Sequence, residues 1–198
     1  MNETINKQTP AIEPLKPLRV GIICNDTNRE DLLHYRQELV NLNKEFGKNI
    51  KLILFGYNGI NDGGNYLTDV DFEFVKPTTI VNYFKQLKSL ELDVIFIPLI
   101  RNIYNVTSEN YNKYLEAGVF KIPIITINIY PYNTLIVDKS NGFLYKEEKD
   151  LVPYLSHLYT QPSLVTIAGA EAHKIVTEEY NYSVENIKII SDLFVLKN

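Results

Sequence analysis

The sequence has little cysteine and no long apolar run. A single cysteine, Cys24, among 198 residues excludes an internal disulfide framework and a cysteine-rich zinc site. The longest apolar runs have the length of strands and fall well short of the roughly 18 residues of a membrane span. The first residues also lack the apolar segment of a secretory signal. We therefore expect no transmembrane segment and a cytoplasmic protein, or one at the inner face of a membrane.

The charge balance is mildly acidic, with 20 Lys and Arg against 24 Asp and Glu and a net charge of -4. A dedicated nucleic-acid binder needs clustered basic residues for its phosphate contacts, so we expect no nucleic-acid partner. Hydrophobic residues make up 45% of the chain, which excludes wholesale disorder. A chain of this length buries a sizeable core as one α/β domain without a metal or disulfide staple.

Several common site motifs are also missing. No G-x-G-x-x-G follows the first predicted strand, where residues 24–28 read Cys-Asn-Asp-Thr-Asn, and there is no Walker A motif or G-x-S-x-G elbow. Asp26 is a lone acid at this position, whereas a receiver domain needs an acidic cluster, and a flavin-binding phosphate loop is absent as well. The histidines fall within predicted helices without a partner at metal spacing. We therefore expect no bound metal and no cofactor.

The chain divides into a lead-in and one domain. Residues 1–17 are polar, carry three prolines and show no period, which predicts a flexible lead-in or linker. Residues 18–198 form the predicted domain. Apolar, β-branched runs predict its strands at 19–24, 50–55, 72–75, 93–99, 122–127 and 143–145. Periodic patterns predict its helices at 29–46, 79–90, 109–119, 148–159, 163–180 and 183–195, with a polar loop at 101–108.

Strands alternate with helices along the chain, and the strands are near-continuously apolar rather than alternating with polar residues. This combination predicts an α/β fold, a single doubly wound Rossmann-like domain with a mostly parallel sheet, helices on both faces and further helices at the C-terminus. Ligands of such sheets bind outside the carboxyl ends of the strands. The loops at 24–28, 56–66 and 100–112 are therefore the candidate site.

The second half carries the most specific pattern. The strand 93–99 contains Pro98, and a polar loop leads to a helix with the sequence Leu-Glu-Ala at 115–117. Pro123 then precedes an apolar strand, and Asn-Gly at 141–142 marks a later turn. This order resembles the C-terminal, donor-binding domain of retaining GT-B glycosyltransferases (glycosyl transferases group 1), over roughly residues 18–182. The resemblance implies a hexosyltransferase-class enzyme that binds a nucleotide-diphosphate sugar and transfers the sugar to a glycan, lipid or protein without a bound metal.

The resemblance also implies site residues, although it assigns no catalytic residue. Glu116 matches the ribose-binding glutamate, the second Glu of the family's E-x7-E pattern. The helix that begins near 108–111 would supply backbone N–H groups to the phosphates. The further donor-binding candidates supply hydrogen bonds, positive charge or an aromatic face: Asn105, Ser108, Asn110, Arg29 and Tyr132.

The sequence departs from the family pattern at several points. Ser108 occupies the position of the first Glu of E-x7-E, Glu109 is one residue out of register, and Lys121 stands where the family usually has Gly. The loop after the first strand lacks the family's Arg and Lys pair. These departures leave an alternative open, a non-catalytic, degenerate GT-B-like interaction or assembly module. A GT-B enzyme reacts its substrates between two domains, so the resemblance also implies a missing N-terminal acceptor domain or a partner chain.

Overall fold

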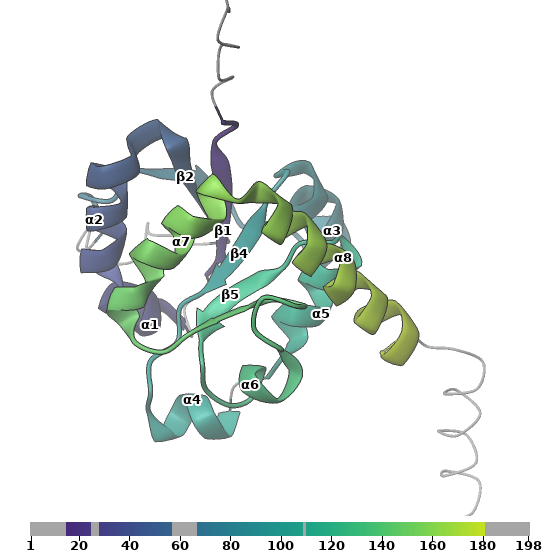
Figure 1. Ribbon diagram of the computed structural model, residues 1–198. Helices are drawn as coiled ribbons and strands as arrows, with labels where there is room; N and C mark the ends of the chain where they lie inside the picture. The colour runs from purple at the N-terminus through teal and green to yellow at the C-terminus, as the bar shows by residue number, and fades with distance from the viewer. Residues whose placement is uncertain (1–14, 25–27, 57–66, 109, 181–198) are drawn as a thin grey trace, which may run out of the picture.

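The computed structural model describes residues 15–24, 28–56, 67–108 and 110–180, which build one parallel sheet between layers of helices (Figure 1). The six strands lie in the order β3-β2-β1-β4-β5-β6, and every described strand pair is parallel. Their bounds are β1 Leu18–Ile23, β2 Ile50–Phe55, β3 Phe72–Val75, β4 Val94–Ile97, β5 Ile124–Ile127 and β6 Phe143–Tyr145. The predicted doubly wound α/β fold is confirmed.

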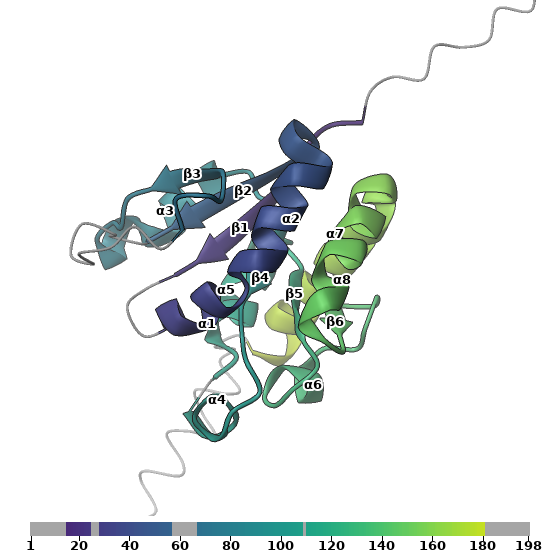
Figure 2. The ribbon, with the colours of Figure 1, turned by 90° about the vertical axis from the view of Figure 1, so that its left-hand side faces the viewer.

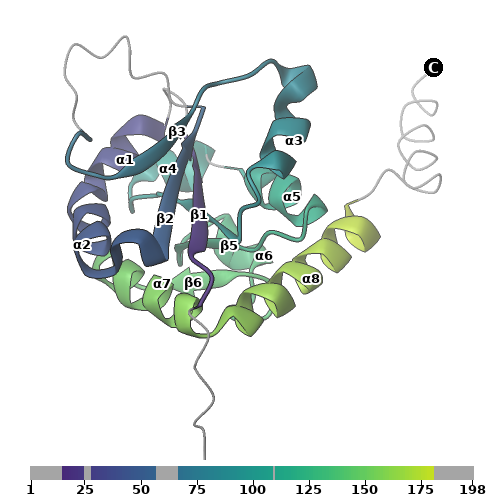
Figure 3. The same ribbon diagram turned by 90° about the horizontal axis from the view of Figure 1, so that it is seen from above.

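Helices cover both faces of the sheet (Figures 2 and 3). Helices α1, α2 and α7 lie on one side, and α3 and α5 lie on the other, where α8 packs along α5. The helix bounds are α1 Arg29–His34, α2 Arg36–Phe46, α3 Ile80–Ser89, α4 Ile103–Ser108, α5 Asn112–Val119, α6 Tyr132–Leu135, α7 Leu151–Thr160 and α8 Pro162–Glu179. Two 3-10 turns, η2 Gly47–Asn49 and η4 Glu148–Asp150, precede β2 and α7.

The central strands are almost entirely apolar because they are covered on both faces. All four residues of β4 and all four of β5 are buried. Their side chains join one continuous core that extends from Leu18 on β1 to Val176 on α8. Near-continuous apolar runs are typical of such doubly covered parallel strands.

Two expectations need correction, and others fall on residues that the structure does not describe. The predicted helix at 29–46 is two helices, α1 and α2, because Tyr35 between them leaves helical geometry and turns its ring into the core. The predicted polar loop at 101–108 contains the short helix α4. The predicted helix at 183–195 lies outside the described residues, as do residues 57–66 of the second candidate loop.

The connection between α5 and β5 explains one departure from the family pattern. Lys121 has a φ of 61°, in the left-handed region that favours glycine. The chain therefore keeps the backbone conformation that a glycine would adopt there, with a lysine in its place. Gly169 of α8 packs directly on this connection, because a Cβ at Gly169 would overlap the carbonyl oxygen of Lys121.

Candidate functional site

The strand order places the candidate site between β1 and β4. The chain runs from β1 through β2 to β3 at one edge, and then returns to β4 and continues to β6 at the other edge. The connections that leave β1 and β4 thus diverge, and a crevice outside their carboxyl ends is the usual ligand site of such a sheet. Helices α1, α4 and α5 begin near these ends (Figure 2).

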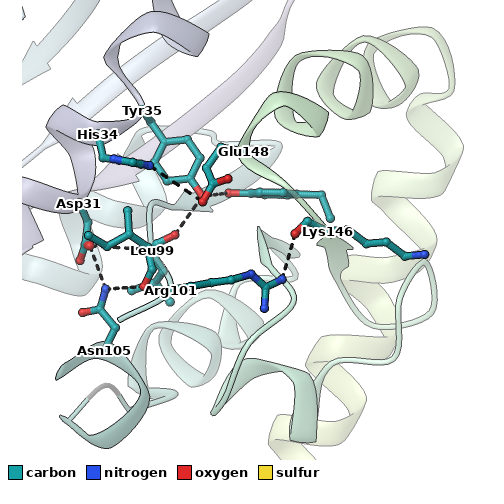
Figure 4. A network of polar contacts seen from close by, with 10 residues as sticks. Asp31, His34, Tyr35, Leu99, Arg101, Asn105, Lys146 and Glu148 are labelled. Carbon is teal, nitrogen blue, oxygen red and sulfur yellow. Dashed lines mark hydrogen bonds and ion pairs between the residues drawn. The ribbon is translucent and has the colours of Figure 1, made fainter. Parts of the chain in front are cut away.

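The connections that leave β1 and β4 diverge at what we call the switch point of the sheet. A buried carboxylate links these two connections to each other (Figure 4). Asp31 of α1 accepts hydrogen bonds at Oδ1 from Asn105 Nδ2, at 2.8 Å, and from the Ile100 backbone N–H, at 3.3 Å. The Asn105 amide also donates to the Ile100 carbonyl, at 3.0 Å. Burial raises the pKa of the Asp31 carboxyl, while these hydrogen bonds and the nearby charges of Lys113 and His34 oppose the rise. This network fixes the loop after β4 against α1.

A pair of buried tyrosines also holds the loop after β4 in place. The Tyr35 hydroxyl donates to the Leu99 carbonyl, at 2.9 Å, and the Tyr145 hydroxyl at the end of β6 donates to Tyr35, at 2.7 Å. Burial raises the pKa of both hydroxyls, so they remain neutral donors. At the rim, Arg101 donates to the Lys146 carbonyl at 2.9 Å (Figure 4). The carboxyl ends of β4 and β6 are therefore fixed relative to each other.

Glu116 lies half-buried on α5 and faces α3. The Tyr83 hydroxyl of α3 donates to Glu116 Oε2 at 2.7 Å. The Tyr83 ring stacks on Phe55, the last residue of β2, with a centroid separation of 5.6 Å and an interplanar angle of 15°. Because Phe55 marks the carboxyl end of β2, the Glu116 carboxylate lies close to the edge of the sheet that holds the candidate site.

The segment before α5 is held by its own side chains. Helix α5 begins at Asn112, later than the predicted start near 108–111. Asn110 Oδ1 accepts a hydrogen bond from the Asn112 backbone N–H, at 2.9 Å, and its carbonyl accepts one from the Tyr132 hydroxyl, at 3.1 Å. Tyr132 is fully buried, so its ring supports this segment from beneath. Direct contact of Asn110 or Tyr132 with a donor stays a prediction.

The remaining predicted residues lie around the same edge. Asn105 is buried in α4, where its amide is used by the Asp31 network. Ser108 is the last residue of α4, and Arg29 is the first residue of α1 and is half-buried. Glu109 lies outside the described residues. The structure thus gathers the predicted residues onto the elements that surround one end of the sheet, and their roles toward a ligand stay predictions.

Sequence reasoning misses Tyr83, Asp31 and the tyrosine pair. Tyr83 and Glu116 are 33 positions apart, and Tyr35 and Tyr145 are 110 apart, so no local pattern links them. Within the described ranges, no group of three or more His, Cys, Asp or Glu is arranged to hold a metal ion. None of the described helices combines the length and apolar character needed to cross a membrane.

The fold is shared with solved glycosyltransferase structures, although no protein-family model and no curated protein matches the sequence. Staphylococcus aureus TarM, solved in a complex that includes UDP, aligns with a TM-score of 0.65 and 19% identity over 96% of this chain and 38% of that chain. Anabaena HepE in complex with UDP-glucose aligns with a TM-score of 0.62 and 14% identity over 90% of this chain and 49% of that one.

WaaG, a glycosyltransferase involved in lipopolysaccharide biosynthesis, aligns with a TM-score of 0.61 and 16% identity, over 87% of this chain and 46% of that one. The chain thus spans less than half the length of each of these three proteins. It has the Rossmann-like fold of a GT-B glycosyltransferase domain, the fold that the sequence resemblance implies.

Proposed function

We propose that the protein binds a nucleotide-diphosphate sugar at the carboxyl edge of its sheet and serves as the donor-binding half of a glycosyltransferase. The placement of Glu116 carries this proposal. Its carboxylate is half-buried on α5, near the carboxyl end of β2, and has acceptor capacity left beyond the Tyr83 hydrogen bond. Similar folds in TarM and HepE were solved with UDP or UDP-glucose, which supports a ligand of this class.

In this proposal each part of the donor meets a distinct part of the site. The Glu116 carboxylate accepts hydrogen bonds from the two ribose hydroxyls. The start of α5 and the positive end of its dipole face the diphosphate. Arg29 and Lys113 add positive charge at the same edge. No metal is required, because the helix terminus and cationic side chains stabilise the leaving diphosphate.

We propose further that sugar transfer uses a second, acceptor-binding domain, on the same polypeptide or on a partner chain. The share of TarM, HepE and WaaG that this chain spans, between 38% and 49%, supports this division. The sugar and the acceptor are not specified by the residues described above.

Titration with UDP, GDP and ADP, and with UDP-glucose, tests the proposal. A ligand that binds the folded state raises the free energy of unfolding by about 2.7 kcal/mol at a hundred times its dissociation constant. We expect stabilisation by at least one of these nucleotides and a loss of most of it in Glu116→Gln. The control Glu45→Gln changes an exposed glutamate on α2, away from the site, and keeps the effect.

The same titration decides between the two functions considered from the sequence. If none of these nucleotides stabilises the protein at millimolar concentration, the donor-binding proposal is wrong. A non-catalytic interaction or assembly module with a GT-B-like fold is then the better description.

A further inference from the structure

The hydrogen bond between Tyr83 and Glu116 joins two helices at the candidate ribose site. The Tyr83 hydroxyl lies 2.7 Å from Glu116 Oε2, and both side chains are half-buried. Through this hydrogen bond, a side chain of α3 contacts the glutamate of α5. A glutamate on an exposed helix face would instead sample several rotamers.

The Tyr83 ring is itself held in place. One face stacks on Phe55, which is 2% exposed, with an interplanar angle of 15°. Phe84 packs against the same ring edge-on, with centroids 5.2 Å apart and an angle of 74°. Packing between these two rings restricts the rotamers of Tyr83, so its hydroxyl is oriented toward Glu116 before a ligand binds.

Tyr83 leaves Glu116 able to bind a ligand. A carboxylate offers about four acceptor positions on its two oxygens. Tyr83 uses one position on Oε2, which leaves Oε1 and a second position on Oε2 for a pair of neighbouring hydroxyls. Burial and the Glu116 charge raise the pKa of the Tyr83 hydroxyl, so tyrosine stays neutral and leaves the negative charge of the carboxylate in place.

We propose that Tyr83 is a positioning residue that presets the Glu116 carboxylate for both ribose hydroxyls and so makes the site select ribonucleotides over 2′-deoxyribonucleotides. This inference rests on the proposed function. Holding the carboxylate in one rotamer before binding removes an ordering cost that a ligand bonded to both carboxylate oxygens would otherwise meet. A 2′-deoxy ligand lacks one of the two hydroxyls, so it gains less from a preset carboxylate.

Calorimetric titration of the full chain with UDP and 2′-deoxy-UDP, and with GDP and 2′-deoxy-GDP, measures this selection. We expect the unaltered protein to bind the ribonucleotide more tightly than its deoxy counterpart. Tyr83→Phe keeps the stacked ring and removes the hydroxyl. It should weaken ribonucleotide binding by up to about tenfold, the cost of ordering one flexible side chain when the ligand binds. Binding of the deoxynucleotide should change much less, so the ratio of the two affinities falls.

Two further variants separate positioning from a structural role. Tyr159→Phe removes a hydroxyl from a half-buried ring that packs on Phe46, away from the site, and should leave the ratio unchanged. In Glu116→Gln the selection is lost, and adding Tyr83→Phe to it should change the ratio no further, because Tyr83 acts through Glu116.

The outcomes are distinguishable. If the unaltered protein binds none of the four nucleotides, the proposed function fails and this inference fails with it. If the protein binds them and Glu116→Gln loses the selection while Tyr83→Phe keeps it, only the role of Tyr83 is overturned. A Tyr83→Phe variant with a lower melting temperature but an unchanged affinity ratio would likewise overturn that role, because the tyrosine would then be purely structural.

Discussion

At the scale of single residues, Asp31 is a buried carboxylate whose ionisation opposes folding. It is 7% exposed, and burial raises its pKa above the ordinary value of 3.8. Between 3.8 and the raised pKa, the native state holds more protons than the unfolded state, so the free energy of unfolding falls as the pH rises through that window. Asp31→Asn retains the Oδ1 acceptor for Asn105 and Ile100 and removes the charge. We expect the free energy of unfolding of this variant to fall less with rising pH than that of the unaltered protein. Urea unfolding from about pH 4 to about pH 7 measures the difference.

The control for this prediction is the neighbouring Glu30→Gln. Glu30 is exposed on the same helix and should leave the pH profile of stability unchanged. A profile of Asp31→Asn that follows the unaltered protein across the whole window would show that the carboxylate is not held in an unfavourable charged state.

Residue partnerships are where the sequence is least informative. Glu116 is identifiable because the local order Leu-Glu-Ala before Pro123 resembles a family motif, and such a motif is contained in a short stretch of chain. The partner of Glu116 is Tyr83, which lies on another helix. Its place depends on how α3 and α5 pack over the end of β2, and that packing is a property of the folded chain. The Asp31 network escapes prediction for the same reason, because it joins α1 to the loop after β4.

At the scale of elements, the strands are predictable because burial on both faces leaves a local mark. The four consecutive buried residues of β4 are all apolar in the sequence, and those of β5 are apolar apart from Thr126. The break between α1 and α2 is not predictable, since the periodicity of apolar residues continues across it. It occurs at Tyr35, whose hydroxyl bonds to Leu99, 64 residues away. Tertiary contacts thus decide where this helix is interrupted.

The contact between α8 and the α5–β5 connection yields a prediction at this scale. A Cβ at Gly169 would overlap the Lys121 carbonyl and lie 3.1 Å from Pro123 Cδ. A backbone carbonyl cannot move aside as a flexible side chain can, so Gly169→Ala should shift α8 outward. We expect a loss of about 1 to 3 kcal/mol in the free energy of unfolding, typical of overpacking. Urea unfolding measures it.

The matched control on the same helix is Ile167→Ala. Ile167 is 60% exposed, so its truncation should change the free energy of unfolding by no more than about 0.5 kcal/mol. Equal stabilities of Gly169→Ala and the unaltered protein would mean that α8 does not pack as closely on Lys121 as the structure describes.

At the scale of the whole molecule, the pairing of β1 with β4 joins two halves of the sheet, one with β1 to β3 and one with β4 to β6. The β1–β2 register pairs six residues, whereas the β1–β4 register pairs two, Val20 with Val94 and Gly21 with Ile95. The seam is reinforced at its start by hydrogen bonds in both directions between Arg19 and Asp93, of 2.8 and 2.9 Å. Beyond the carboxyl ends of β1 and β4, the Asp31 hydrogen bonds to Ile100 and Asn105 link the two halves a second time.

The buried core extends without interruption across this seam, so we expect one cooperative unfolding transition. The chain has 14 tyrosines and no tryptophan, so tyrosine fluorescence reports tertiary structure while far-ultraviolet circular dichroism reports helices. The two probes should give coincident urea transitions. Two separated transitions would instead mean that the short β1–β4 seam is the weak point, and that the half with β1 to β3 and the half with β4 to β6 unfold independently. In that case a ligand bound across the switch point, as proposed for the nucleotide sugar, would bring the two transitions together, because it is bound only while both halves are folded.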